Sequence, residues 1–244
     1  MSQGHFPHDE TLTVGKLRMR ASQIIDLMSP YLSDHRKERI SKVVRDRTFS
    51  VVTVLENVYD RGNSSAVMRS CEAMGFQAVH MIEPGDKFKK ANRVTKGADK
   101  WLDVYQWKTT SECVDHLRSK QYKIYATHLD AKAVPIENID WSVPSAIILG
   151  NEKDGISPEM QKLCDQSVII PMQGFVQSFN ISVAGAIALY HIYRERKLKL
   201  GQSGDLNEKQ LEILTAHFLL RSSKNPERLL QRLIERMPNN LLKK

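Results

Sequence analysis

The chain has 244 residues, 41% of them apolar, and a formal net charge of +8. This length and composition fit one folded α/β domain with appended helices and exclude a largely disordered chain. No run of about eighteen uncharged apolar residues occurs, and the N-terminal MSQGHFPHDE lacks the basic start and apolar stretch of a signal peptide, so we expect a cytoplasmic protein without a membrane span.

The predicted elements begin with helix and continue as alternating strands and helices. Helical spacing without strand-like alternation over residues 17–47 predicts an N-terminal helical extension, residues 1–48. The next domain, residues 49–200, has short segments rich in β-branched residues, which predict strands at 50–56, 77–83, 122–128, 145–150 and 166–172. Helical periodicity predicts helices at 65–75, 110–120 and 157–165, the last with Ser157 as N-cap and Pro158 at its first position. This order predicts a mainly parallel sheet covered by helices.

A further helix follows the fifth strand, and its first turns are rich in small residues. These are Ser182, Ala184, Gly185, Ala186 and Ala188. A buried helix ordinarily carries larger apolar side chains, so this run predicts that another backbone or a ligand comes close to the helix.

The C-terminal segment, residues 201–244, is predicted to be a basic helical extension. It starts with the soft linker GQSGD at 201–205, and Arg228, Arg232 and Arg236 recur every four residues beside an apolar face. Residues 1–50 hold nine Lys/Arg against six Asp/Glu, residues 194–244 hold twelve against six, and residues 51–193 hold fifteen against sixteen. Basic ends around a neutral middle indicate that the ends bind a polyanion, although solvated helix faces explain the charge equally well.

The loops after the first, fourth and fifth predicted strands are the candidate site, because ligands of parallel sheets bind beyond the carboxyl ends of the strands. These loops are rich in Asn, Gln, Ser and Gly. No strand is followed by G-x-G-x-x-G, and GNEKDG has Ile156 where a phosphate-binding loop needs Lys, which argues against a dinucleotide or nucleoside triphosphate. The three scattered cysteines predict neither a disulfide framework nor a zinc site, and no metal is expected.

Together the three loops resemble a known family. NSSAVMR (Asn63 to Arg69), GNEKDG (Gly150 to Gly155) and IPMQGFVQSFNISVA (Ile170 to Ala184) resemble the three motifs of the SpoU branch of the SPOUT RNA 2′-O-ribose methyltransferases. The resemblance spans roughly residues 50–197, and the V-Q-S before the Asn resembles the TrmH group of tRNA guanosine methyltransferases. It implies an α/β fold with a mainly parallel sheet and a C-terminal trefoil knot, and a homodimer formed through the knot region.

The resemblance also implies a cofactor and a set of site residues. S-adenosylmethionine would be held by backbone groups around Thr127, Gly150, Ile170, Met172 and Phe179. Arg69 is the catalytic candidate, either as the base or as the group that holds the substrate phosphate. Because a guanidinium, with a pKa above about 12, is a poor base near neutral pH, we expect Arg69 to orient the 2′-OH and neutralise the phosphate, while the proton leaves through the phosphate.

Four more polar residues complete the predicted catalytic set. Asn63 precedes the predicted helix 65–75, where an N-cap is expected, and would also position Arg69 or the ribose. Glu152 would pair with Arg69 or Lys153, or hold Asn63. Ser178 and Asn180 would cap the last helix and, by resemblance, fix the ribose or phosphate.

Arg61, Arg228 and Arg232 are the predicted RNA contacts, and tRNA is the predicted partner. Only RNA has a 2′-OH, and the TrmH-like motif implies the guanosine at position 18 of the tRNA D-loop. Three alternatives stay open: a ribosomal RNA guanosine, a non-catalytic RNA-binding module that kept the fold, and a nucleotide-binding α/β transferase of small molecules.

Overall fold

The computed structural model of the chain describes residues 4–83 and 97–236. They form two units. The first, here called the sheet unit, contains Arg47–Asp205 and the described residues before Phe6. The second, the terminal unit, contains Phe6–Asp46 and the described residues from Leu206 onward, so both ends of the chain contribute to it.

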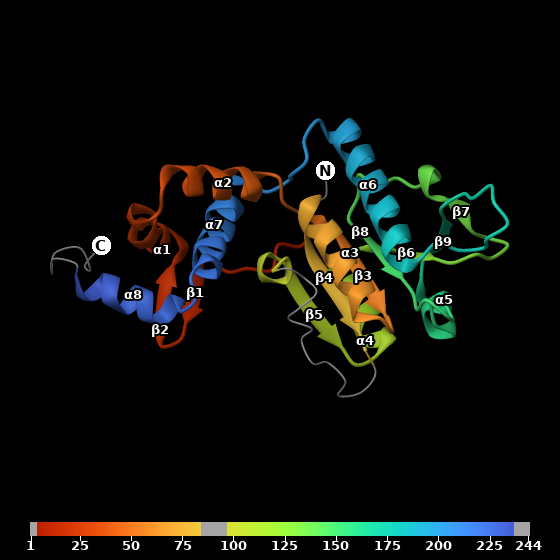
Figure 1. Ribbon diagram of the computed structural model, residues 1–244, viewed down its shortest axis with the longest axis horizontal. Coiled ribbons are helices and arrows are strands. Elements are labelled where there is room, and N and C mark those ends of the chain that lie inside the picture. The colour runs from red at the N-terminus through yellow and green to blue at the C-terminus, as the bar shows by residue number, and fades with distance from the viewer. Residues whose placement is uncertain (1–3, 84–96, 237–244) are drawn as a thin grey trace. The chain divides into compact units, whose positions relative to one another are not determined.

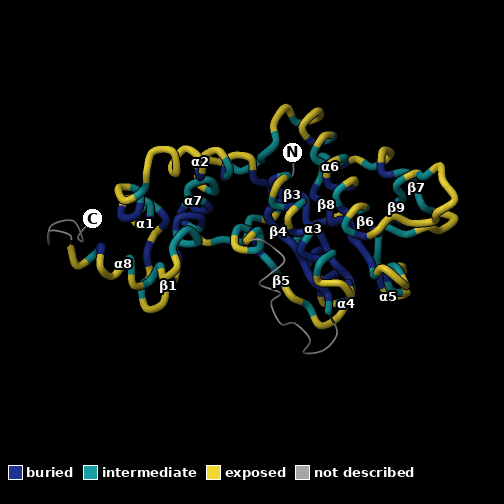
Figure 2. Tube along the Cα trace, in the orientation of Figure 1, coloured by how far each residue is buried: buried dark blue, intermediate teal, exposed yellow. Residues whose placement is uncertain are grey.

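A seven-stranded parallel sheet forms the centre of the sheet unit, with strand order β5-β4-β3-β8-β6-β9-β7 (Figure 1). The strands are β3 (Thr48–Glu56), β4 (Phe76–Ile82), β5 (Asp103–Trp107), β6 (Lys123–Thr127), β7 (Val134–Pro135), β8 (Ser145–Leu149) and β9 (Gln166–Ile169). Every residue of β3, β4 and β8 is buried, and Figure 2 shows these strands as the buried centre of the unit. Strands that are buried along their whole length and mostly apolar are typical of parallel sheets covered on both faces.

Four helices of the sheet unit cover the sheet: α3 (Arg61–Ala73), α4 (Thr110–Ser119), α5 (Pro158–Leu163) and α6 (Ile181–Leu200). Short 3-10 turns lie at Asp99–Trp101 and Ile136–Asn138. The five predicted strands and three predicted helices are confirmed to within a few residues, including Ser157, whose side chain accepts a hydrogen bond from the backbone N–H of Met160 at 3.0 Å. The mainly parallel α/β architecture is therefore confirmed, whereas passage of the chain through a knot stays a prediction.

Two strands and one helix boundary differ from the sequence prediction. β5 has the sequence DVYQW and lies at the edge of the sheet, partly exposed, so it lacks the apolar run that marks the central strands. β7 has only two residues. α3 begins at Arg61 because the Asp60 side chain caps it, accepting a hydrogen bond from the backbone N–H of Gly62 at 2.6 Å.

The small residues of α6 allow the close approach that the sequence predicted, although to side chains more than to backbone. A Cβ atom placed on Gly185 would lie 3.0 Å from Cδ1 of Leu149 and 3.0 Å from Cγ2 of Val67. α6 therefore packs closely against α3 and the end of β8, and α3 and α6 lie side by side in Figure 1.

The terminal unit is mainly helical, but its first elements correct the prediction of continuous helical spacing over residues 17–47. β1 (Thr11–Val14) and β2 (Leu17–Arg20) form an antiparallel hairpin, and α1 (Ala21–Met28), a 3-10 turn (Ser29–Tyr31) and α2 (Asp34–Arg45) follow. α7 (Glu208–Ser222) packs against α1 and α2, and α8 (Pro226–Glu235) packs against α1. The α1 core residues Ile24 and Leu27 are buried, as are Leu214 of α7 and Leu230 of α8.

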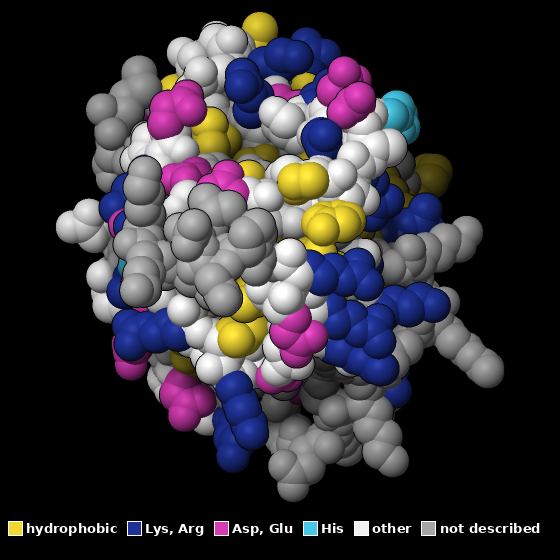
Figure 3. Space-filling model, turned by 90° about the vertical axis from the view of Figure 1, so that its left-hand side faces the viewer, with side chains coloured by type: hydrophobic (Ala, Val, Ile, Leu, Met, Phe, Trp, Pro, Cys, Tyr) yellow, Lys and Arg dark blue, Asp and Glu magenta, His cyan; other side chains and the backbone are white. Residues whose placement is uncertain are grey.

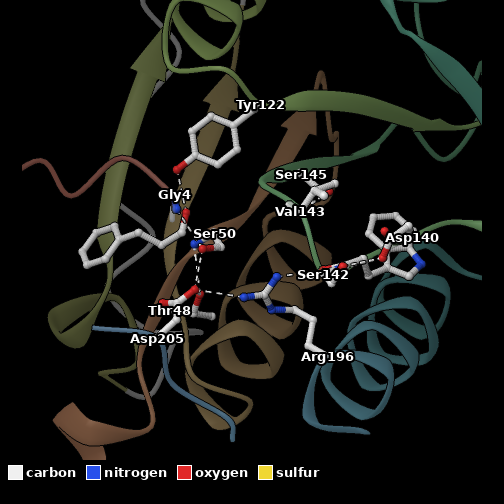
Figure 4. Close-up of polar contacts among 12 residues, drawn as sticks. Gly4, Thr48, Ser50, Tyr122, Asp140, Ser142, Val143, Ser145, Arg196 and Asp205 are labelled. Carbon is white, nitrogen blue, oxygen red and sulfur yellow. Dashed lines mark hydrogen bonds and ion pairs between the residues drawn. The ribbon is translucent and has the colours of Figure 1, made fainter. Parts of the chain in front are cut away.

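The predicted soft linker ends in a buried polar network of the sheet unit (Figure 4). Oδ2 of Asp205 accepts hydrogen bonds from Oγ1 of Thr48 at 2.8 Å, from Oγ of Ser50 and from Nη2 of Arg196 at 2.9 Å. Nη1 of the same arginine donates to the carbonyl of Trp141 at 2.7 Å. The arginine side chain is only 3% exposed, so its charge depends on Asp205 for a partner.

No helix in residues 4–83 or 97–236 is long and apolar enough to cross a membrane.

Candidate active site

Three loops of the sheet unit meet at the side chain of Asn63. Its amide nitrogen donates to Oε1 of Glu152 at 2.8 Å, and its amide oxygen accepts a hydrogen bond from Nδ2 of Asn180 at 3.3 Å. These residues come from the start of α3, the loop after β8 and the start of α6. The sequence therefore predicted correctly that the polar loops after the first, fourth and fifth predicted strands come together.

Asn63 does not cap α3, contrary to the sequence expectation. Asp60 is the N-cap, and Asn63 lies in the first turn of the helix. Its side chain is therefore not used by its own helix and can bridge the two other loops.

The Glu152 carboxylate joins the loop after β8 to the loop after β3. Besides Asn63, it accepts hydrogen bonds from the backbone N–H groups of Tyr59 at 3.1 Å and Asp60 at 3.4 Å. Burial by itself raises the pKa of Glu152, but the hydrogen bonds from Asn63 and from backbone N–H groups outweigh it and lower the pKa below its ordinary value. Of the partners predicted for Glu152, Asn63 is the one that the structure brings to it.

The loop after β8 is a tight turn that leaves no space for a side chain at Gly150. A Cβ atom there would lie 2.3 Å from the carbonyl carbon of Gly155 and 2.4 Å from the backbone nitrogen of Ile156. Asn151 and Gly155 pair through two backbone hydrogen bonds of 2.7 and 2.9 Å, and Gly155 has a φ of +69°. Glycine is thus required at the first of these positions for space and favoured at the second for its conformation.

The side chain of Asn151 ties this turn to the loop after β3. Its Nδ2 donates to the carbonyl of Asn57 at 2.7 Å, and its Oδ1 accepts from the backbone N–H of Lys153 at 2.7 Å. Both loops are therefore held relative to each other by Asn151 as well as by Glu152.

A buried carboxylate beneath the loops was missed by the sequence analysis. Glu56, at the end of β3, is 0% exposed and accepts hydrogen bonds from Oγ1 of Thr110 at 2.6 Å and from Oγ and N of Ser157 at 2.7 and 2.8 Å. It ties β3 to the first residues of α4 and α5. A Glu directly after an apolar run was the signal that could have found it.

The start of α6 carries the third part of the cluster. Oδ1 of Asn180 accepts hydrogen bonds from N and Oγ of Ser182 at 2.9 and 2.5 Å, which confirms that Asn180 is the N-cap. Ser178 was also expected to cap this helix, and that expectation is wrong. Its side chain is exposed and makes no capping hydrogen bond among the described residues.

Arg69 lies on α3 outside this polar cluster. It follows Asn63 by six residues, about 9 Å along a helix axis, and points in a different direction around the helix. Its side chain is exposed, and within the described residues no ion pair joins it to Glu152. The guanidinium therefore faces solvent, where a substrate phosphate can reach it.

The segment between β9 and α6 has backbone groups that the described chain does not use. Residues 171–179 make no backbone hydrogen bond with other described residues, and a Cβ atom on Gly174 would meet nothing within 4 Å. Ile170 packs partly against the core, Met172 is half-buried and Phe179 is 39% exposed. Thr127, at the end of β6, donates from Oγ1 to the carbonyl of Ile148 at 2.9 Å. The backbone N–H and C=O groups of residues 171–179 can therefore bind a ligand that has hydrogen-bond donors and acceptors on its edges.

The predicted RNA contacts lie in both units. Arg61 is exposed at the first turn of α3, and burial raises the pKa of nearby Glu83 while the charge of Arg61 partly offsets that rise. Arg228 and Arg232 are exposed on α8. α2 lies within the predicted N-terminal extension, for which RNA contact was expected without named residues, and its buried residues are Ile40 and Val44. Its exposed basic side chains are Arg36, Lys37, Arg39, Lys42 and Arg45.

The three cysteines are free, and Cys71 and Cys113 are buried. Burial raises the pKa of each of these two thiols to about 12, so neither is a nucleophile near neutral pH. Within the two described ranges, no three His, Cys, Asp or Glu side chains gather as metal ligands would.

Comparison with known proteins gives the same family as the motifs. The model of the SpoU rRNA Methylase family matches residues 50–190. A protein of Borreliella burgdorferi named tRNA (guanosine(18)-2′-O)-methyltransferase is 38% identical over 168 residues, which are 69% of this chain and 77% of that protein. The crystal structure of the A. aeolicus TrmH/SpoU tRNA modifying enzyme has a TM-score of 0.70 at 28% identity and covers 78% of this chain and 97% of its own.

A second solved structure is the AdoMet-bound rRNA methyltransferase from Sinorhizobium meliloti, with a TM-score of 0.54 at 27% identity, covering 59% of this chain and 56% of its own. The family predicted from the three motifs is confirmed. Because the family model spans more than half of the residues, and the Borreliella relative is matched over more than two thirds of its length, the chain belongs to the SpoU rRNA Methylase family.

Proposed function

We propose that this protein transfers a methyl group from S-adenosylmethionine to the 2′-OH of a guanosine ribose in tRNA, at position 18 of the D-loop. The observation that carries the proposal is the meeting of the three motif loops at Asn63, in a chain whose Borreliella relative is named for this reaction. A cytoplasmic location follows from a tRNA substrate.

The loops after β6, β8 and β9 fit S-adenosylmethionine. Adenine binds through hydrogen-bond donors and acceptors on its ring edges, and residues 171–179 provide backbone groups that have no partner in the described chain. Backbone around Thr127, Gly150, Ile170, Met172 and Phe179 would hold the cofactor. When bound, it supplies an electrophilic methyl group on a sulfonium.

The side chains of the site hold and orient the acceptor nucleotide. Arg69 binds the phosphate next to the target ribose, because its exposed guanidinium can donate two parallel hydrogen bonds to phosphate oxygens. It thereby orients the 2′-OH, whose proton passes to a phosphate oxygen. Asn63 and Asn180 position the ribose, and Ser178 supplies a further hydroxyl. The Glu152 carboxylate holds the Asn63 amide, which in turn accepts the hydrogen bond from Asn180.

A homodimer through α6 is part of this proposal. Val183, Ile187 and Tyr190 recur at helical spacing and are 45%, 37% and 52% exposed, and Phe179 extends the stripe to the start of the helix. Apolar stripes of this size on a helix are typical of protein interfaces.

RNA binding uses basic side chains of both units. Arg61 contacts RNA from the sheet unit, and α8 with Arg228 and Arg232, together with α2, contacts it from the terminal unit. Figure 3 shows groups of Lys and Arg side chains, with fewer Asp and Glu among them, on the face that it draws.

Labelled S-adenosylmethionine, incubated with the purified protein and unmodified tRNA transcript, tests the proposal. The expected product carries one 2′-O-methyl group at guanosine 18, and a transcript with a 2′-deoxyguanosine there is not labelled. Arg69→Ala is expected to lower methylation at least 100-fold, whereas Arg118→Ala, at an exposed arginine of α4, leaves it within about twofold. Label in ribosomal RNA alone would assign the ribosomal substrate, and no label in either RNA would contradict a methyltransferase.

A further inference from the structure

Tyr59 is a strongly exposed aromatic residue at the edge of the polar cluster. Its side chain is 88% exposed, although large aromatic side chains are usually buried at least in part. Its own backbone N–H donates to Glu152, so the ring begins directly beside the residues that would hold the ribose. Phe175, from the loop before α6, is also fully exposed.

The backbone that carries Tyr59 is held in place on both sides. Asn57 has a φ of +52°, donates its backbone N–H to the carbonyl of Ile82 at 2.9 Å and accepts from Asn151 at 2.7 Å. Val58 is buried in the core. After Tyr59, Asp60 donates to Glu152 and caps α3. The ring is thus presented from a fixed loop, and its exposure does not result from a loose segment.

Both signs of charge lie around this ring: Asp60 and Glu152 are acidic, but their carboxylates accept hydrogen bonds within the cluster, and two basic residues lie beside them. Exposed Arg61 lies two residues along the chain from Tyr59, and exposed Lys153 adjoins Glu152, which accepts the Tyr59 hydrogen bond. An aromatic face beside basic side chains is the arrangement that single-stranded nucleic acid uses, with bases stacked on the ring and phosphates near the cations.

We propose that Tyr59 is a stacking platform for a nucleobase of the RNA substrate, at the methylated nucleotide or the one next to it. This inference rests on the proposed function. When a nucleotide leaves its stack so that its 2′-OH reaches the site, its base needs a new surface to stack on. Tyr59 provides that surface at low entropic cost because its loop is already held.

Steady-state kinetics with unmodified tRNA transcript test the role of the ring. Tyr59→Leu keeps an apolar side chain but removes the aromatic face, and we expect the KM for tRNA to rise about tenfold, equivalent to about 1.4 kcal/mol, with kcat within about twofold. Tyr59→Phe and Tyr59→Trp should retain the wild-type KM, and affinity for S-adenosylmethionine should not change. Tyr31→Leu, at a tyrosine that is 63% exposed in the terminal unit, is the matched control.

A binding measurement separates failure of this inference from failure of the proposed function. Transcripts with 2-aminopurine at position 17, 18 or 19 should lose fluorescence on binding to the wild type and to Tyr59→Phe, and much less on binding to Tyr59→Leu. This readout needs no methyl transfer. An unchanged KM and unchanged quenching in Tyr59→Leu would overturn the inference. A different sedimentation coefficient for Tyr59→Leu than for the wild type would also overturn it, because it would show that a second copy of the chain covers the ring.

Discussion

Asn63 is the residue on which the three loops converge, and Glu152 is its charged partner. A carboxylate that accepts several hydrogen bonds favours its ionised form, so the folded pKa of Glu152 lies below the unfolded value. The stabilisation is therefore fully present above the unfolded pKa and is lost as the pH falls through the folded pKa. Near neutral pH the Glu152 tether is intact.

Removal of the Asn63 amide should raise the pKa of Glu152. In Asn63→Ala the carboxylate loses its 2.8 Å donor while burial still disfavours the charge, so Glu152 becomes protonated, and its hydrogen bonds to the loop after β3 weaken, at a higher pH. NMR titration of the Glu152 carboxyl carbon measures this. Asn138→Ala, at an exposed asparagine distant in the sequence, should leave the titration unchanged, and an unchanged pKa in Asn63→Ala would show that the amide does not support the carboxylate.

At the scale of elements, α6 has two different faces. Gly185, Ala188 and Leu189 are buried toward α3 and β8, whereas Val183, Ile187 and Tyr190 are exposed. The first face explains the glycine, because a Cβ at Gly185 would already press on Leu149 and Val67. The second face is left for the partner of the proposed dimer.

Charge on the exposed face of α6 should dissociate the dimer. The double variant Val183→Glu/Ile187→Glu places two like charges in each half of a symmetric interface, and we expect sedimentation at micromolar concentration to change from dimer to monomer. Lys162→Glu, which adds a negative charge at an exposed lysine of α5, away from α6, is the control and should stay dimeric. A wild-type monomer in this measurement would refute the proposed interface.

The network at Asp205 should make a large contribution to stability. In Asp205→Ala the buried Arg196 loses its charged partner, and Thr48 and Ser50 lose an acceptor (Figure 4). Removal of one member of a buried ion pair costs about 3–5 kcal/mol, which lowers the Tm by about 6–20 °C for a unit of this size.

A matched exposed pair provides the control for Asp205. Asp34 pairs with Lys37 at 3.0 Å, but their side chains are 91% and 42% exposed, so Asp34→Ala should lower stability by less than about 1 kcal/mol. Differential scanning calorimetry compares the two variants. Equal Tm values for the two variants would mean that burial of Arg196 does not determine how much stability is lost when Asp205 is removed.

At the scale of the whole molecule, the sequence of the terminal unit holds sixteen Lys/Arg against ten Asp/Glu, a net charge of +6, and the sheet unit carries the remaining +2. In the proposed function, the basic terminal unit supplies most of the affinity for RNA, and the nearly neutral sheet unit carries the residues for methyl transfer. Binding should therefore weaken as salt rises, through the release of counterions from the RNA backbone.

Loss of α8 arginines should weaken RNA binding without changing the chemical step. Arg228→Ala and Arg232→Ala should each reduce the slope of log K against log salt by about 1, with single-turnover methylation at saturating tRNA unchanged. Filter binding at several salt concentrations measures the slope, and Lys162→Ala, at an exposed lysine of α5, is the control. A lower single-turnover rate in the arginine variants would contradict a role limited to binding.

The sequence by itself determined the elements whose signals are local. Short segments rich in β-branched residues predicted the central strands, Ser157 and Pro158 marked the start of α5, and the three motif loops predicted the family. Each of these signals depends on residues close together in the chain, through backbone sterics, capping or the burial of a short run.

Only the tertiary structure decided which distant groups meet. Glu152 holds Asn63 and not Arg69. Asp60, not Asn63, caps α3. Asp205, at the end of a predicted linker, pairs with the buried Arg196. The edge strand β5 and the hairpin at residues 11–20 are stabilised by neighbouring strands, while their own sequences carry weak patterns. The physical reason is that a hydrogen bond or ion pair depends on distance in space, and the spacing of residues along the chain does not contain that distance.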